Sequence, residues 1–132
     1  MAYFNWTDDL SVGNAQIDHD HKQLVNLVNK LYDAMKAGQG NSVLGGILDE
    51  LIKYTASHFK REEMFMQQIG YADMAAHKAE HVKLVNDVLD LQTRFKSGST
   101  TLSVSVFNFL GDWLRTHIKS RDAKLGLALA GK

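Results

Sequence analysis

Two histidines in the stretch AAHKAEHVKLV, residues 75–85, have the spacing of side chains that could bind one metal ion together. His77 and His81 are four residues apart, so on a helix they project from the same face. They share a row with the apolar residues Met74 and Leu84, which predicts that they face a core. A buried imidazole needs a partner for each ring nitrogen, and a metal ion is one such partner.

The same combination recurs in three other segments with helical periodicity. His58 and Glu62 are four residues apart in an apolar row, His117 continues the row of Trp113, and His21 begins another row. A single pair of this kind usually lies on the protein surface without binding metal, or stabilises a helix. A buried histidine often has a backbone group or a water molecule as its partner. Five of the six histidines nevertheless fall in inward rows. Together these rows predict a metal site inside the protein.

Asp122 is the least regular member of this set. It lies five residues after His117, about 140° further round an ideal helix, so the two share no strict face. Its carboxylate can turn inward only if the helix loosens near KSRD, residues 119–122. With Asp122 and Glu62 the set has too many ligands for one tetrahedral zinc, which favours two metals bridged by carboxylates. Imidazole-rich ligation suits iron, copper, nickel or zinc rather than calcium or magnesium.

Four segments of helical periodicity, separated by short glycine-containing breaks, position these residues. They predict an all-α protein, an antiparallel up-down-up-down four-helix bundle with an extended N-terminal arm. We expect a single domain with the arm over residues 1–17, the bundle over about 18–122 and a tail over 123–132. The inward rows are Leu24, Val28, Leu31, Met35; Leu44, Leu48, Leu51, Thr55, His58, Glu62, Phe65, Ile69; Met74, His77, His81, Leu84, Val88, Leu91, Phe95; and Leu102, Val106, Phe109 or Leu110, Trp113, His117.

Three terminal or ambiguous segments complete this prediction. The stretch 101–109 alternates apolar and polar residues like a strand, but a lone strand would have no partner, so a helix is favoured. In the arm, Phe4 and Trp6 are expected to cover the bundle. The tail 123–132 is too short for a separate element and is expected to pack or fray.

Composition narrows the class of protein. The chain has 132 residues, 45% of them hydrophobic and 23% charged, with a formal net charge of zero, as in ordinary globular domains. No basic stripe indicates a nucleic-acid partner, and the absence of cysteine excludes disulfides and thiolate metal sites. No signal peptide or membrane-spanning segment is recognisable. We expect a cytoplasmic protein and, because no large apolar patch stands out, a monomer.

At these residues the sequence resembles the hemerythrin family, and more specifically the single-domain bacteriohemerythrins. The matching pieces cover nearly the whole chain: Trp6, IDHDHKQL around His21, HFKREE from His58, HKAEH from His77 and HIKSRD from His117. One departure is the aspartate at position 20, where many relatives have glutamine. Because residue 20 lies on a different face from residue 21, no effect on metal binding is expected.

The resemblance implies a non-haem di-iron centre, bridged by a solvent-derived oxo or hydroxo group, that binds O2 reversibly. One iron keeps an open position for the ligand, next to an apolar pocket. The resemblance assigns His77, His81 and His117 to one iron, His21 and His58 to the other, and Glu62 and Asp122 as bridges between them. The candidate pocket walls, for which ordinary core packing is the alternative, are Leu24, Val25, Phe59, Trp113 and Leu114.

Three neighbours of the candidate ligands are given no role. His19 lies about 200° from His21 round the helix and is expected to be exposed. Glu63 and Glu80 are predicted to face solvent.

The predicted function is O2 carriage, storage or delivery to an oxygen-consuming enzyme, and not catalysis by this chain. A di-iron oxidase or peroxidase is the alternative, and substrate-dependent turnover by the diferrous protein would support it. An oxygen sensor is another alternative, which a partner retained by only one oxygenation state would support. Iron storage is disfavoured, because a two-iron site has little capacity.

Overall fold

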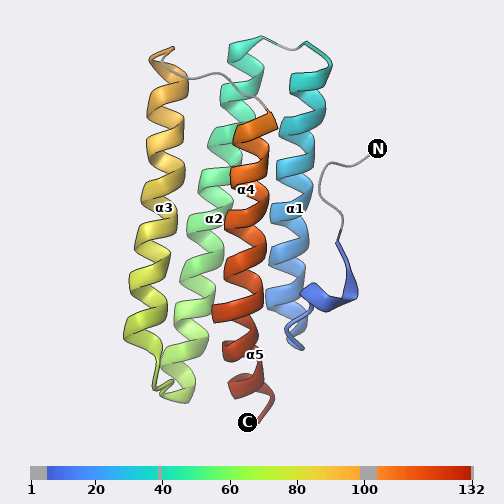
Figure 1. The fold of residues 1–132 in the computed structure, drawn as a ribbon. Helices are drawn as coiled ribbons and strands as arrows, with labels where there is room; N and C mark the ends of the chain where they lie inside the picture. Colours follow the sequence, from blue (N-terminus) through green and yellow to red (C-terminus); the bar gives the residue numbers. More distant parts are fainter. Residues whose placement is uncertain (1–5, 39, 99–103, 132) are drawn as a thin grey trace.

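The computed structural model describes residues 6–38, 40–98 and 104–131. Every regular element in these ranges is helical, and Figure 1 shows the four long helices side by side, each running opposite to the one before it. The predicted all-α, up-down-up-down four-helix bundle is therefore confirmed. The elements are η1 (Asp8–Leu10), α1 (Ala15–Lys36), α2 (Asn41–Ile69), α3 (Met74–Lys96), α4 (Val104–His117), η2 (Ile118–Asp122) and α5 (Ala123–Ala130).

Local signals begin and end the helices that carry the candidate site. At the start of α1, the Asn14 side chain accepts a hydrogen bond from the Ile17 amide at 3.0 Å, which satisfies one of the free N–H groups of the first turn. At the end of α2, Gly70 has φ +62°, a left-handed conformation that costs glycine little. The chain then reverses within residues 70–73 and enters α3.

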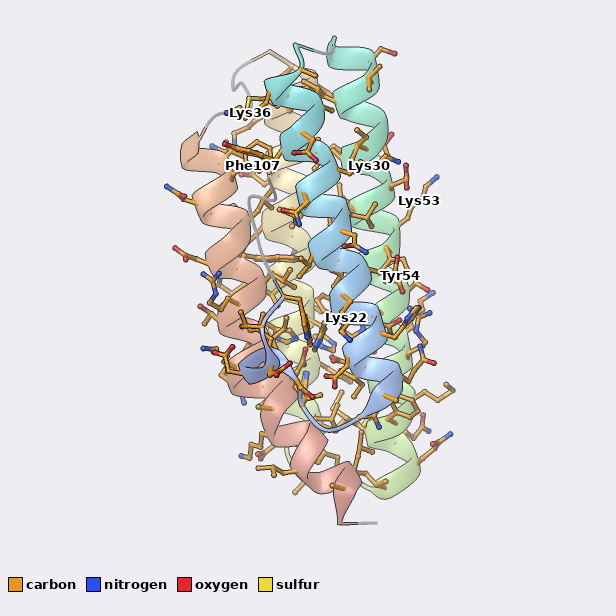
Figure 2. All side chains as sticks on the ribbon, turned by 90° about the vertical axis from the view of Figure 1, so that its right-hand side faces the viewer. Lys22, Lys30, Lys36, Lys53, Tyr54 and Phe107 are labelled. Atoms are coloured by element: carbon orange, nitrogen blue, oxygen red, sulfur yellow. The ribbon has the colours of Figure 1, made fainter. Side chains whose placement is uncertain are left out.

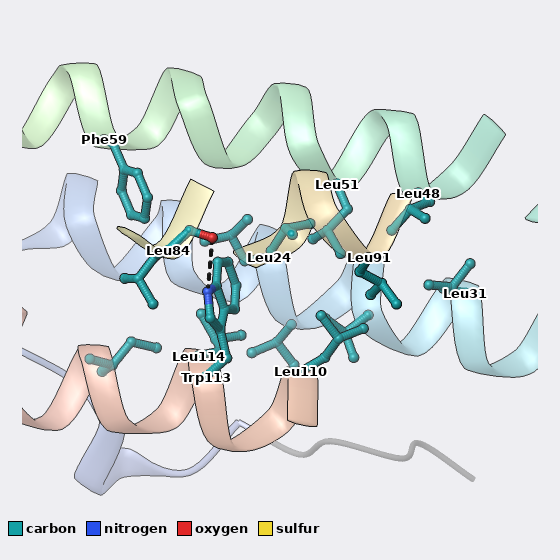
Figure 3. Packing of buried hydrophobic residues seen from close by; sticks show 14 of the residues in the cluster. Leu24, Leu31, Leu48, Leu51, Phe59, Leu84, Leu91, Leu110, Trp113 and Leu114 are labelled. Carbon is teal, nitrogen blue, oxygen red and sulfur yellow. Dashed lines mark hydrogen bonds between the residues drawn. The ribbon is translucent and has the colours of Figure 1, made fainter. Parts of the chain in front are cut away.

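Much of the apolar core fills the part of the bundle away from the candidate site. In Figure 3, leucines from all four long helices point toward one another, among them Leu31, Leu48, Leu91 and Leu110. Each of these side chains is at most 3% exposed, and burial of a leucine contributes about 1.5–3 kcal/mol. The core therefore supplies the stability that lets the other end of the bundle bury polar residues.

The inward row of α4 differs in part from the prediction. Of the two alternatives, Leu110 is fully buried and Phe109 is 42% exposed, whereas Phe107, which the predicted row omits, is fully buried. Residues 101–109 are helical from Val104 onward, and Leu102 lies outside the described residues.

The C-terminal segment is a helix, α5, where the sequence analysis expected no separate element. It continues from α4 through η2 and so needs no new helical nucleus, which is the costly step for a short helix. Leu125 is fully buried, and Gly126 lies against the backbone of Val12 in the arm. The tail therefore packs against the bundle and helps to hold the N-terminal arm.

The described part of the N-terminal arm, residues 6–14, lies beside α1 in Figure 1. Leu10 and Val12 are buried, and Trp6 packs partly buried against the core, as expected for this residue. Phe4 lies outside the described residues. Helix α1 begins at Ala15, a few residues before the predicted edge of the bundle. Among the described residues no helix is long and apolar enough to cross a membrane.

Candidate metal centre

The seven residues predicted to bind metal converge inside one end of the bundle, and each is at most 3% exposed. They form two overlapping groups in which one ligand atom from each residue lies within 4.8 Å of the others. Both groups contain Glu62 and Asp122. We call the group that adds His21 and His58 the two-histidine group, and the group that adds His77, His81 and His117 the three-histidine group.

The two-histidine group joins α1 and α2. His58 and Glu62 are four residues apart on α2, and His58 Nε2 lies 3.1 Å from Glu62 Oε2. His21 Nε2 lies 2.7 Å from Asp122 Oδ2 and 3.7 Å from Glu62 Oε2. The His21 and His58 rings meet edge to face with centroids 4.8 Å apart. Both side chains therefore present a ring nitrogen to the same pair of carboxylates.

The three-histidine group uses the other oxygen of each carboxylate. His81 Nε2 lies 2.9 Å from Glu62 Oε1, while His77 Nε2 and His117 Nε2 each lie 3.0 Å from Asp122 Oδ1. Glu62 and Asp122 thus divide their oxygens between the groups: Oε2 and Oδ2 face one, Oε1 and Oδ1 the other. This is the arrangement that a carboxylate needs if it bridges two metal ions.

A widened helical turn carries Asp122 into the centre. The segment Ile118–Asp122 is a π-helix, whose hydrogen bonds span five residues instead of four. Residues five apart, such as His117 and Asp122, can therefore face the same side, and Asp122 is fully buried. The predicted loosening of the helix near residues 119–122 is confirmed.

The donor set fits a bound cation. Buried polar atoms nearly always have a hydrogen-bond partner, yet His58 Nε2, His117 Nε2 and Glu62 Oε2 have none among the described residues. All three atoms belong to the contacts within the two groups. Buried electron-pair donors that face one another without protein partners are what a metal ion requires.

Electrostatics in the cluster favour ionised carboxylates. Burial by itself raises the pKa of Glu62, but hydrogen bonds from the surrounding histidines outweigh it and hold that pKa well below its usual value. Burial and the charge of Glu62 raise the pKa of Asp122. The contacts from His117 and His21 outweigh both effects and hold this pKa well below its usual value. Burial lowers the pKa of His58 and His117, but the carboxylates bring both well above the ordinary histidine value. Without a metal, protons on the histidines balance the carboxylates.

Asp20 contacts a candidate ligand, His58, which the sequence analysis did not foresee. It is 1% exposed, and one of its oxygens lies 2.9 Å from His58 Nδ1, on the side of the ring away from the other ligands. Residue 20 does lie on a different face of α1 from His21, as predicted. That face is turned toward α2, so the carboxylate reaches a ligand on the neighbouring helix.

Glu63 and Glu80 also contact candidate ligands, so the prediction that they face solvent holds only in part. Glu63 Oε2 lies 2.9 Å from His81 Nδ1, and Glu80 Oε1 lies 2.9 Å from His117 Nδ1. Their side chains are 28% and 25% exposed, so each has one edge in solvent and one against a histidine. Helical periodicity separates inward from outward rows but does not resolve such flanking positions. His19 is exposed, as predicted.

A small cavity adjoins the two-histidine group. Its volume is about 10 Å³, close to the space that one water-sized molecule needs. Four of the predicted walls line it, while Val25 is buried in the core but does not reach it. Leu84, which the predicted inward row of α3 already contained, completes the apolar wall (Figure 3). The lining residues are His21, Leu24, His58, Phe59, Leu84, Trp113, Leu114 and His117.

Fold and site together define a four-helix bundle with a histidine and carboxylate metal centre in its interior. Residues 12–128 match the family described as Hemerythrin HHE cation binding domain. The chain is 44% identical to a bacteriohemerythrin of Methylococcus capsulatus, across 98% of this chain and 99% of that protein. It is 36% identical to a bacteriohemerythrin of Pseudomonas aeruginosa, across 93% and 79% of the respective chains.

A solved structure agrees with these sequence relationships. The crystal structure of a wild-type hemerythrin superposes on this fold with a TM-score of 0.88 and 42% sequence identity, covering 98% of this chain and 99% of that one. The chain belongs to the hemerythrin family. Family membership and the buried histidine and carboxylate cluster together support iron binding at this centre.

Proposed function

We propose that this protein binds O2 reversibly at a non-haem di-iron centre, for oxygen carriage, storage or delivery to an oxygen-consuming enzyme. The observation that carries the proposal is the division of the Glu62 and Asp122 oxygens between two groups of histidines. One metal ion would be too few for such a set, since tetrahedral sites use four ligands. Relatives named bacteriohemerythrin add support for an oxygen-binding protein rather than an enzyme.

In this proposal each group holds one iron. His77, His81 and His117 bind the first iron, His21 and His58 bind the second, and Glu62 and Asp122 bridge the two. When bound, the two irons supply the electrons for reversible O2 binding. The two-histidine group has one protein ligand fewer, and a metal site with fewer protein ligands keeps a position open for an incoming molecule.

The surrounding side chains protect that position. The cavity beside His21 and His58 is walled mainly by apolar groups, including Leu24, Phe59 and Leu114. Its volume of about 10 Å³ admits one small molecule and little else. Because water and protons promote irreversible oxidation, a small apolar cavity favours release of O2 over a side reaction.

The test is a cycle of oxygenation. The iron-loaded protein is reduced anaerobically, exposed to O2 and then placed under vacuum while its visible spectrum is followed. We expect an absorption band that appears with O2 and disappears under vacuum over several cycles. Prompt and irreversible oxidation of both irons would overturn the proposal and favour an oxidase or peroxidase, which substrate-dependent turnover would then have to support.

A further inference from the structure

Asp20 has an unusually complete set of hydrogen-bond donors for a buried carboxylate. Oδ2 accepts from Arg61 Nε at 2.8 Å, and Oδ1 accepts from Arg61 Nη2 and from Tyr54 Oη, both at 2.9 Å. Gln16 Nε2 adds a longer contact of 3.3 Å to Oδ1. His58 Nδ1 lies 2.9 Å from Oδ2. These donors satisfy the lone pairs of both oxygens, and the two bonds from Arg61 have the forked geometry of strong arginine–carboxylate pairs.

This environment determines which nitrogen of His58 carries hydrogen. An ionised carboxylate only accepts hydrogen bonds, so the contact from His58 requires a hydrogen on Nδ1. A metal binds the neutral form of the ring, and with hydrogen on Nδ1 the lone pair of that form lies on Nε2. Nε2 is 3.1 Å from Glu62 Oε2 and has no hydrogen-bond partner among the described residues. Asp20 therefore orients the His58 ring for metal binding through Nε2.

Arg61 connects this buried carboxylate to the surface. Its side chain is 30% exposed, whereas Asp20 is 1% exposed. Figure 2 shows Tyr54 on the side of the bundle that α1 and α2 form. Arg61 lies about two turns further along α2, with its guanidinium 5.6 Å from the Tyr54 ring centre. The positive charge of Arg61 balances part of the negative charge that would otherwise act on His58.

Glu63 and Glu80, the carboxylates that contact His81 and His117, are more exposed than Asp20. Glu80, beside His117, receives one bond from Arg121 Nε at 2.7 Å, and its side chain is 25% exposed. Solvent therefore screens Glu80 more than Asp20, and interactions of a buried charge are weakened less by water. Among these carboxylates, the one beside the two-histidine group is the most sheltered.

We propose that Asp20 and Arg61 act as a pair of positioning residues that sets how strongly His58 donates to the metal of the two-histidine group. This inference rests on the proposed function. A charged acceptor on Nδ1–H increases the electron density available at the opposite nitrogen of an imidazole ligand. Asp20 strengthens His58 as a ligand in this way, and Arg61 limits the effect by drawing the carboxylate's charge toward itself.

Substitutions of Asp20 and Arg61 should therefore shift the midpoint potential of the iron in opposite directions. Asp20→Asn keeps a hydrogen-bond acceptor for His58 but removes the charge, so a weaker ligand destabilises the ferric more than the ferrous state. We expect a higher midpoint potential and about 10–100-fold weaker binding of Zn²⁺ at the two-histidine group. Arg61→Gln keeps one donor to Asp20 but removes the balancing charge. We expect a lower midpoint potential for this variant, with Zn²⁺ binding at least as tight as in the wild type.

The experiment compares the wild type with Asp20→Asn, Arg61→Gln, their double variant and the surface control Lys30→Gln. Lys30 forms an exposed pair with Glu50 that does not contact the centre. Zn²⁺ affinity is measured by competition with a chelator, and the midpoint potential by spectroelectrochemical titration of the iron-loaded proteins. The double variant restores a neutral pair and should lie between the single variants, while the control should match the wild type.

Several outcomes would overturn the inference. If the two residues only support the fold, the midpoint potential and Zn²⁺ affinity of both single variants should shift in the same direction. If they do not influence His58 at all, both quantities should equal those of the wild type. If Asp20→Asn does not fold, Arg61→Gln still tests the direction of the shift in potential, because the Arg61 side chain is partly exposed. Independently, nitrogen-15 spectra of the Zn²⁺-loaded wild type must show a hydrogen on His58 Nδ1. A wild type that holds no iron would overturn the proposed function as well, whereas unshifted variants of an iron-loaded protein would overturn this inference alone.

Discussion

At the scale of single residues, the two carboxylates of the centre differ in how they reach it. Glu62 comes from the same helical row as His58, so an ordinary α-helix places it. Asp122 shares no such row with His117 and depends on the π turn. Both nevertheless present one oxygen to each group of histidines. The centre therefore depends on individual side chains from α1, α2, α3 and the α4–η2 segment. Removal of one of them should weaken metal binding.

We expect His77→Ala to reduce the iron content below two per chain. The substitution removes one nitrogen of the three-histidine group and one of the two 3.0 Å contacts of Asp122 Oδ1, leaving the contact from His117. Metal analysis of the purified, reconstituted protein measures the effect. His19→Ala is the matched control, because His19 is exposed on α1 and should be replaceable without loss. Two irons and normal O2 binding in His77→Ala would show that the proposed ligand assignment is wrong.

At the scale of elements, α5 and the N-terminal arm support each other at the end of the bundle near the centre. Lys119 in η2 also pairs with Asp9 in the arm, at 2.6 Å between Nζ and Oδ2. Since Asp122 directly precedes α5, the packing of this helix helps to hold the π turn in place. Gly126 is the point of closest approach, where a Cβ would collide with the Val12 backbone oxygen and lie 2.9 Å from the Val12 Cβ.

We expect Gly126→Ala to lower the free energy of unfolding by about 1–3 kcal/mol, the usual cost of inserting a methyl group into a tightly packed contact. Gly46→Ala is the control, for which the free energy of unfolding should rise instead of fall. Gly46 is exposed within α2 and a Cβ there meets nothing within 4 Å, so alanine should stabilise the helix by about 0.5–1 kcal/mol. Chemical denaturation of both variants measures the difference, and equal effects would contradict the proposed arm contact.

At the scale of the whole molecule, the rows of the helices were predictable because histidines and leucines share one periodicity. The row of α3 from His77 to Phe95 is buried as predicted. Asp122 required a π turn, which is a departure from that periodicity. The spacing suggested only a loosened helix near residues 119–122, and the resemblance supplied the reason to include Asp122 among the ligands. Asp20, Glu63 and Glu80 could not be placed, because their partners lie on other helices or segments far along the chain and the pattern of one helix contains no information about them.

Metal loading should stabilise the entire bundle. The site exists only in the folded chain, so a metal bound at a thousandfold excess over its Kd adds about 4 kcal/mol to the free energy of unfolding. For a chain of this size we expect the melting temperature to rise by roughly 10–20 °C. Thermal melts with and without Fe²⁺ under anaerobic conditions measure the rise, and a chelator should reverse it. Identical melting temperatures would contradict a metal centre built from four helical segments.

This stabilisation by metal should depend on pH. In the metal-free protein, burial lowers the pKa of His21 and His77, but hydrogen bonds to Asp122 and Glu62 raise both above the ordinary histidine value. A group with a raised pKa contributes stability that is fully present below about pH 6.5 and is lost as the pH rises through the folded-state pKa. The metal-free protein should therefore become less stable as the pH rises above about 6.5.

The metal-loaded protein should respond in the opposite direction, because a metal must displace the protons held by the histidines and binds more tightly as the pH rises. The rise in melting temperature on adding Zn²⁺ should therefore be larger at about pH 8 than at about pH 6. Paired melts of the metal-free and Zn²⁺-loaded protein at both pH values measure this difference. A rise that is independent of pH would mean that the histidines exchange no protons on metal binding, and that the buried cluster is not the site at which the metal binds.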